Sequence, residues 1–145
     1  MKVVVDTNLL VRAFLSSTGR AAQLLEAFLA GRFRIVLSPL LIAELRRVLA
    51  YPRIASRPGF RSGDANTFVD RLTLQADVVP GHYDVRGVPD DLSDNALLSA
   101  AVEARADYIV SEDAEQLLPL KQYRLVDFVI NIVDCESFLR RLDEE

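Results

Sequence analysis

The sequence predicts an α/β fold in which a mostly parallel sheet carries helices on both faces. Strand signals and helix signals alternate along the chain, as they do in the crossover units that join parallel strands. The length of 145 residues and the apolar content of 50% suit one domain with a full core, and no repeat or linker divides the chain. We therefore expect a single domain over residues 1–145.

Residues that end or begin helices set the expected elements of the first half. Gly31 is typical of the position after a helix C-terminus, and Ser38-Pro39 places an N-cap before proline at the first helical position. Pro52 ends the helix that this pair opens. The expected elements are a strand over 2–6, helices over 7–16 and 17–31, a strand over 34–37, a helix over 39–51, a basic segment with a short helix and a loop over 53–63, and a helix over 64–76.

The second half repeats the alternation of strands and helices after a loop rich in Gly, Pro and Asp. Ser93 or Asp94 offers the N-cap of the helix that follows this loop. The expected elements are a short strand over 77–80, the loop over 81–92, a helix over 93–106, a strand over 108–110, a short helix after residue 113, a strand over 129–133 and a closing helix over 135–143.

Charge is distributed unevenly between the two halves. Residues 1–72 hold eleven basic and five acidic residues, a net charge of +6, whereas residues 73–145 hold six basic and sixteen acidic residues, a net charge of −10. Ten of the eleven basic residues are arginines, which suit bidentate contact with phosphate. Arginines around a site can hold phosphate even in an acidic protein. A solvated helical surface is the alternative interpretation.

Cysteine content and hydropathy exclude several classes of protein. The single cysteine, Cys135, rules out an internal disulfide framework and a cysteine-based zinc site. No secretory signal is visible, because an acid at position 6 interrupts the N-terminal apolar run. No stretch approaches the roughly 20 apolar residues that a membrane-spanning helix needs. We expect a cytoplasmic protein with no membrane partner.

Four acidic residues follow strand or loop ends. Asp6 ends the first strand, Glu44 lies early in the helix after the second strand, Asp94 opens the helix after the long loop, and Asp113 follows the strand over 108–110. In open α/β sheets, ligands bind beyond the carboxyl ends of the strands. We therefore expect these carboxylates at one edge. The simpler alternatives are a turn or cap for Asp6, Asp94 and Asp113, and an edge position for Glu44.

Helical periodicity separates two of these acids from ordinary surface residues. At about 100° per residue, with Leu40 at zero, Glu44 falls near 40° among leucine and valine rather than among the arginines that follow it. With Asp94 at zero, Leu98 and Ala101 flank it, while Asn95 falls on the polar face. A carboxylate buried alone is unfavourable, so such groups are paired, hydrogen-bonded or bound to metal.

Other catalytic chemistries find little support in the chain. His82 is the one histidine, and a surface loop position explains it most simply. No G-x-S-x-G elbow, Walker loop or G-x-G-x-x-G fingerprint is present. Zinc prefers nitrogen and sulfur ligands, whereas a cluster of oxygen ligands suits Mg²⁺ or Mn²⁺. Such a cluster typically holds metal near a phosphate, activates water and stabilises the leaving oxygen.

Four blocks of the chain, in order and over nearly its whole length, resemble the PIN domain family and its VapC-like toxin branch. These blocks are VVVDTNLL at 3–10, SPLLIAELRRVL at 38–49, DDLSDNALLSAAVEARADYIVSEDAEQL at 90–117 and NIVDCESFL at 131–139. The resemblance implies a Rossmann-like three-layer α/β/α sandwich that cuts RNA with Mg²⁺ or Mn²⁺. It also implies a homodimer and a cognate antitoxin protein.

The resemblance assigns roles to individual residues. Asp6, Glu44, Asp94 and Asp113 match the four metal-binding, catalytic acids. Supporting roles fall to three polar residues that match the family pattern: Asn8, Asn95 and Ser111. The chain departs from the pattern near the fourth acid, with Glu112 in place of a small residue and Glu115 in place of Asp. Either of these could substitute for Asp113 as the fourth ligand.

These observations predict a metal-dependent endoribonuclease that hydrolyses RNA phosphodiester bonds with a metal-activated water, the toxin of a toxin–antitoxin pair. Arginines of the first half are candidates for holding the RNA backbone, by charge alone: Arg12, Arg53, Arg57 and Arg61. One alternative is an inactive PIN-like module that only binds RNA or protein. Another is an aspartyl-phosphate phosphatase, although Asn8 stands where that chemistry wants a second acid.

Overall fold

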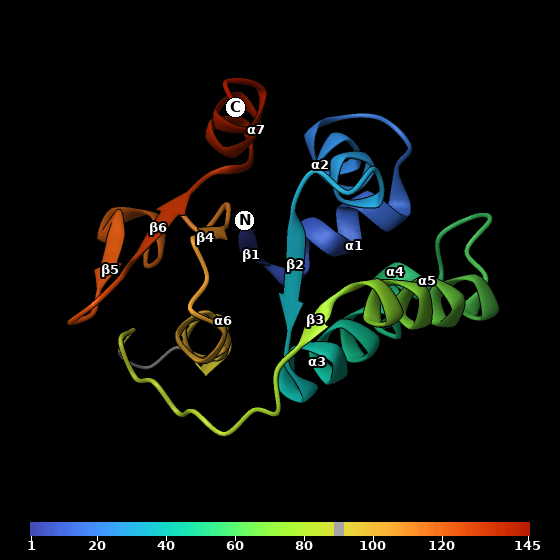
Figure 1. Cartoon of the computed structure of the whole chain (residues 1–145). Coiled ribbons are helices and arrows are strands. Elements are labelled where there is room, and N and C mark those ends of the chain that lie inside the picture. The colour runs from blue at the N-terminus through green and yellow to red at the C-terminus, as the bar shows by residue number, and fades with distance from the viewer. Residues whose placement is uncertain (89–91) are drawn as a thin grey trace.

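A computed structural model describes residues 1–88 and 92–145, so Asp90 and Asp91 of the third matching block lie outside the described residues. The strands form one sheet in the order β3-β2-β1-β4-β6-β5, in which every neighbouring pair is parallel except β5 and β6 (Figure 1). The strands are β1 (Lys2–Val5), β2 (Arg34–Leu37), β3 (Asp77–Val78), β4 (Tyr108–Val110), β5 (Gln122–Arg124) and β6 (Val129–Val133). The predicted α/β class with a mostly parallel sheet is confirmed.

Helices cover the sheet on both sides. In Figure 1, α6 lies on the side of β1 and β2 opposite α1 and α2, and it packs across β1, β2 and β4. On the other side α2 contacts both α1 and α7. Helix α3 contacts α1 and α5 and also reaches α6. The helices are α1 (Thr7–Leu15), α2 (Arg20–Leu29), α3 (Pro39–Leu49), α4 (Pro52–Ala55), α5 (Ser62–Gln75), α6 (Leu92–Ala104), α7 (Cys135–Asp143) and the 3₁₀ helix η1 (Leu118–Leu120).

The central strand β1 is buried on both faces. Val3, Val4 and Val5 are at most 2% exposed, as expected for a β-branched run inside a parallel sheet. The chain extends the sheet from β1 to β2 and β3 on one side, and then returns to place β4 on the other side. Such a change of direction is where ligands bind in open α/β sheets. The residues that follow β1 and β4 therefore lie at the expected binding edge.

Backbone pairing sets the register at this edge. Val5 of β1 pairs with Val110 of β4, and the Asp6 amide donates to the Val110 carbonyl at 2.9 Å. The residues directly after the two strands, Asp6 and Ser111, therefore lie side by side. The sheet thus brings together two predicted site residues that are 105 positions apart in the chain.

Two expected elements differ from the structure, and one strand of the structure was not expected. The helix after the long loop begins at Leu92, so Asp94 lies in its first turn rather than at its N-cap. The helix expected directly after Asp113 begins only at Leu118, because the Asp113 carboxylate accepts from the Glu115 and Gln116 amides and forms a turn. Strand β5 was not predicted, since three mostly polar residues at a sheet edge carry too short a signal.

The structure around Pro52 also differs from the prediction. Pro52 does not simply end a helix: α3 stops at Leu49, and Pro52 begins the short helix α4 at the first helical position, where proline is favoured.

Within the described residues, no helix is long and apolar enough to cross a membrane.

Candidate active site

The four predicted acids line one pocket at the carboxyl edge of the sheet. They come from the end of β1, from α3, from α6 and from the turn after β4, and the pocket has a volume of about 270 Å³. The residues around it are Asp6, Thr7, Asn8, Glu44, Val48, Asp94 and Asp113. The folded chain therefore gathers carboxylates that lie up to 107 positions apart.

Asp6 is both a helix cap and a pocket residue. Its Oδ1 accepts the Asn8 amide at 3.2 Å as the N-cap of α1, and its Oδ2 accepts the Ser111 hydroxyl at 2.9 Å. Burial raises the pKa of Asp6, hydrogen bonds from Ser111 and Asn8 oppose this shift, and the charges of Glu44 and Asp113 add to it. Each carboxylate oxygen retains a further lone pair, so capping does not prevent a ligand role.

Ser111 connects the first acid to the fourth. It is completely buried, and its hydroxyl donates to Asp6 while accepting the Asp113 amide at 3.0 Å. The Asp113 carboxylate caps the following turn, accepting from the Glu115 and Gln116 amides at 3.1 Å each. A hydrogen bond with the Asp94 carboxyl is the largest of the influences that lower the pKa of Asp113, and the amide bonds act in the same direction.

Glu44 lies at the margin of the buried face of α3, not within it. Leu40, the reference for the predicted apolar stripe, is 70% exposed, whereas Leu41 and Leu45 are buried. The Glu44 side chain is 16% exposed, and its Oε1 lies 3.8 Å from the Arg47 guanidinium, a contact that the helical angles did not predict. Glu44 therefore reaches the pocket from the edge of the apolar stripe.

Thr7 also lines the pocket, and its contact with Glu44 was not predicted from the sequence. Its side chain is buried, and its hydroxyl donates to Glu44 Oε2 at 3.0 Å. The signal was present in part, because Thr7 follows Asp6 directly at the strand end. The pairing with a residue 37 positions later depends on how α1 packs against α3.

Asp94 is the most buried of the four acids, at 6% exposure. It lies in the first turn of α6, beside Leu97, Leu98 and Ala101, which are at most 2% exposed. Asp94 therefore lies in the apolar stripe, as its helical angle predicts. A helix cap does not explain its position, because α6 has already begun at Leu92.

Asn95 is buried, although the helical angles placed it on a polar face. Its side-chain oxygen accepts the Val88 amide and its nitrogen donates to the Val88 carbonyl, each at 2.7 Å. One turn later the Ser99 hydroxyl accepts the Val85 amide at 2.7 Å, and after another turn Glu103 accepts the His82 amide at 3.0 Å. The loop before residue 89 thus covers the polar face of α6.

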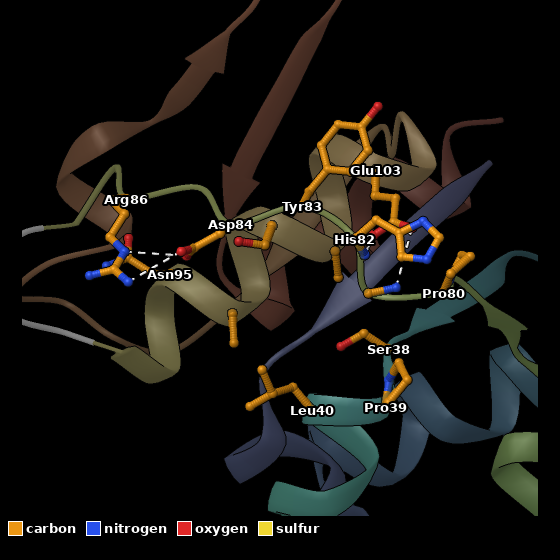
Figure 2. Close-up of a pocket in the computed structure, with 14 residues that line it drawn as sticks. Ser38, Pro39, Leu40, Pro80, His82, Tyr83, Asp84, Arg86, Asn95 and Glu103 are labelled. Atoms are coloured by element: carbon orange, nitrogen blue, oxygen red, sulfur yellow. Dashed lines mark hydrogen bonds and ion pairs between the residues drawn. The ribbon is translucent and has the colours of Figure 1, made fainter.

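Figure 2 shows this loop opposite the start of α3, with Pro39 and Leu40 across a pocket of about 510 Å³ from His82 and Asp84. The pocket shares both of its helices with the carboxylate pocket, since Leu40 lies one turn before Glu44 on α3, and Asn95 follows Asp94 on α6. The hydrogen bonds of Asn95 therefore hold the loop to the helix that carries Asp94, while a supporting role of Asn95 in metal binding stays a prediction.

Replacing Asn95 with Leu is expected to lower the free energy of unfolding by about 2–3 kcal/mol. The variant leaves a buried Val88 amide and carbonyl without their side-chain partner, and each such group costs about 1–3 kcal/mol before relaxation. Urea denaturation measures the change. Asn66→Leu, at an exposed position of α5, is the matched control and should change stability by no more than about 0.5 kcal/mol. Equal effects of the two variants would contradict the role given to Asn95.

The donor chemistry of the carboxylate pocket fits a hard divalent cation. Four carboxylates and the oxygens of Thr7 and Asn8 surround it, with no nitrogen ring or sulfur ligand, which is the set that Mg²⁺ and Mn²⁺ prefer. Over residues 1–88 and 92–145, no three acidic, histidine or cysteine side chains already stand close enough to hold one ion.

The two acids near Asp113 in the sequence, Glu112 and Glu115, lie outside the carboxylate pocket. Glu112 accepts the Cys135 amide at 3.2 Å and lines a neighbouring pocket, and Glu115 is exposed. Of these three acids, only Asp113 lines the pocket with Asp6 and Asp94. The position of Asp113 is thus the better match to a fourth ligand.

The four candidate arginines fall into two groups. Arg12 and Arg57 line the pocket that contains Glu112, together with Arg20, whereas Arg53 and Arg61 do not line it. All four side chains belong to exposed residues. The structure thus brings together two of the four arginines proposed from charge.

Comparison with known proteins places the chain in a family. A chain of similar fold is present in the crystal structure of VapBC2 from Rickettsia felis bound to a DNA fragment from their promoter. The two chains are 16% identical in sequence, with a TM-score of 0.58. The alignment covers 91% of this chain and 98% of that chain. No curated protein matches the sequence. The family model described as PIN domain matches residues 2–115. Because this match spans well over half of its length, the chain belongs to the PIN domain family.

Proposed function

We propose that the protein is a divalent-metal-dependent endoribonuclease, with Asp6, Glu44, Asp94 and Asp113 as its catalytic, metal-holding residues. One observation carries the proposal: four acids from four separate segments converge on one pocket at the switch point of the sheet. Such convergence is electrostatically unfavourable without a cation, because like charges repel and burial disfavours ionised carboxylates. The PIN domain match supports the same reading of the pocket.

When bound, a Mg²⁺ or Mn²⁺ ion would supply activation of water and neutralisation of charge for phosphodiester hydrolysis. The chain itself orients the carboxylates. Ser111 and the Asn8 amide each donate to Asp6, and Thr7 donates to Glu44. These bonds orient Asp6 and Glu44, two of the four acids that line the pocket.

RNA is the proposed substrate, and the cytoplasm is the proposed location. The first half of the chain carries a net +6 charge, and part of that charge lies beside the carboxylate pocket. We further propose a toxin role, with a cognate antitoxin and a homodimeric state. The similar fold of a chain in the VapBC2 structure supports this role through the fold alone.

A non-catalytic PIN module that only binds RNA or protein is the main rival. One observation favours this rival: among the described residues, no three acidic, histidine or cysteine side chains stand close enough together to hold one ion. All four acids are nonetheless present in the pocket, which a binding module would not need. The phosphatase alternative is weaker, because Asn8, two residues after Asp6, has no carboxylate to serve as its general acid.

End-labelled single-stranded RNA distinguishes these functions. With Mn²⁺ the protein should cleave it internally, excess EDTA should stop the reaction, and added Mn²⁺ should restore it. Binding without cleavage under all three conditions would support the inactive module. Hydrolysis of p-nitrophenyl phosphate without RNA cleavage would support the phosphatase.

A further inference from the structure

A second pocket, of about 500 Å³, adjoins the carboxylate pocket. Consecutive residues line the two pockets at two separate places. Asn8 belongs to the carboxylate pocket and Leu9 to the second pocket; likewise Asp113 belongs to the first and Glu112 to the second. Because neighbouring Cα atoms are about 3.8 Å apart, the linings of the two pockets meet at both of these places.

The second pocket is predominantly basic. Arg12, Arg20 and Arg57 line it, and Glu112 is its one acid. Arg20 forms an ion pair with Glu136 at 3.3 Å. Among the described residues, Arg12 and Arg57 form no ion pair, so their charges are not offset by a contacting carboxylate. Two guanidinium groups are therefore available to a ligand.

The geometry of α1 relates these arginines to the acids. Asn8 and Arg12 are four residues apart on this helix, so they share a face and lie about 6 Å apart along its axis. A chain that runs along α1 and passes over the carboxylate pocket would next meet Arg12. Guanidinium groups bind phosphate in a bidentate manner, which suits the ester oxygens of a nucleic-acid backbone.

We propose that Arg12 and Arg57 bind a backbone phosphate of the RNA, next to the phosphodiester that lies at the four acids. The identity of the ligand as RNA rests on the function proposed above. Glu112 faces the same pocket and opposes the binding through its charge. The sequence suggested the same role for Arg53 and Arg61, but their places outside the pocket exclude them from this contact.

Fluorescence anisotropy with a labelled single-stranded RNA, in EDTA, measures binding without metal-dependent cleavage. We expect the Arg12→Gln, Arg57→Gln double variant to bind at least about 10-fold more weakly in 50 mM salt. The slope of log K against log salt should become shallower by about 0.7, the value for one lost phosphate contact on a single strand. The matched control is the Arg53→Gln, Arg61→Gln double variant, which removes the same charge but should bind within about 2-fold of the original protein.

A third variant tests whether removal of a negative charge from the pocket strengthens RNA binding. Glu112→Gln removes the negative charge from the pocket and keeps an oxygen to accept the Cys135 amide. It should bind RNA several-fold more tightly. A drop in affinity would contradict the role given to this pocket, because the substitution leaves every proposed RNA contact in place. Thermal unfolding checks that each variant folds.

Three other results would overturn the inference. Equal losses of RNA affinity in the two double variants would indicate that diffuse charge, not this pocket, binds RNA. Absence of RNA binding by the original protein in EDTA would also contradict it, and displacement of RNA by an acidic peptide at equal concentration would indicate a protein ligand. The nuclease proposal is tested separately by Mn²⁺-dependent cleavage. If cleavage is absent while the binding pattern is as expected, the nuclease proposal fails and the phosphate site remains.

Discussion

Asp94→Asn is expected to reduce Mn²⁺-dependent RNA cleavage by at least about 100-fold. Loss of a partner that merely orients a metal ligand already costs about 10–100-fold in affinity or activity, so loss of a ligand should cost more. Asp94 is the most buried of the four acids, and its carboxyl is hydrogen-bonded to Asp113. Initial cleavage rates at saturating Mn²⁺ measure the effect.

The same variant should remain folded, since Asn preserves the shape of the side chain and removes a charge from a crowded pocket. Its urea unfolding transition without metal should lie at or above that of the original protein. Glu115→Gln is the control, because this exposed acid lies outside the pocket, and it should retain cleavage within about 2-fold. Undiminished cleavage by Asp94→Asn, or equal losses in both variants, would contradict the assignment.

Mn²⁺ is expected to stabilise the folded protein strongly. A ligand that binds only the folded state contributes RT ln(1 + [L]/Kd), which is about 2.7 kcal/mol at 100 times Kd. The four acids also repel one another without a cation, and the charges of Glu44 and Asp113 help to raise the pKa of Asp6. The midpoint of thermal unfolding should therefore rise with Mn²⁺ concentration, as measured by scanning calorimetry.

Asp6→Asn should remove most of this stabilisation. The side-chain oxygen of Asn still accepts the Asn8 amide, so the cap of α1 is kept while the charge is lost. A Mn²⁺-dependent shift of the same size in Asp6→Asn would show that the ion binds elsewhere on the protein. No shift in the original protein up to millimolar Mn²⁺ would show that the pocket does not hold the ion in solution.

The convergence of Asp6 and Asp113 could be predicted because it depends on the direction of the parallel strands. Parallel strands end at a common edge, so an acid directly after β1 and another shortly after β4 must lie near each other. The buried position of Asp94 also followed from its neighbours in α6. These inferences need only the identity of the strands and the period of a helix. The extent of the domain, residues 1–145, stays a prediction.

Contacts between distant segments could not be predicted in the same way. Glu44 was placed among apolar residues that include Leu40, but Leu40 is exposed, because the buried face of α3 is decided by its packing against neighbouring helices. Asn95 was placed on an open polar face that the loop covers, and an extended loop carries no periodic signal. The contact of Thr7 with Glu44 likewise depends on tertiary packing.

The location of Mn²⁺ in a crystal of the protein tests the central claim most directly. Anomalous scattering identifies the ion without reference to activity. The account predicts a peak within coordinating distance of carboxylate oxygens of Asp6 and Asp94, together with Glu44 or Asp113. A peak confined to surface acids such as Asp143 and Glu144, or no peak at millimolar Mn²⁺, would contradict the proposal that these four acids form a metal centre.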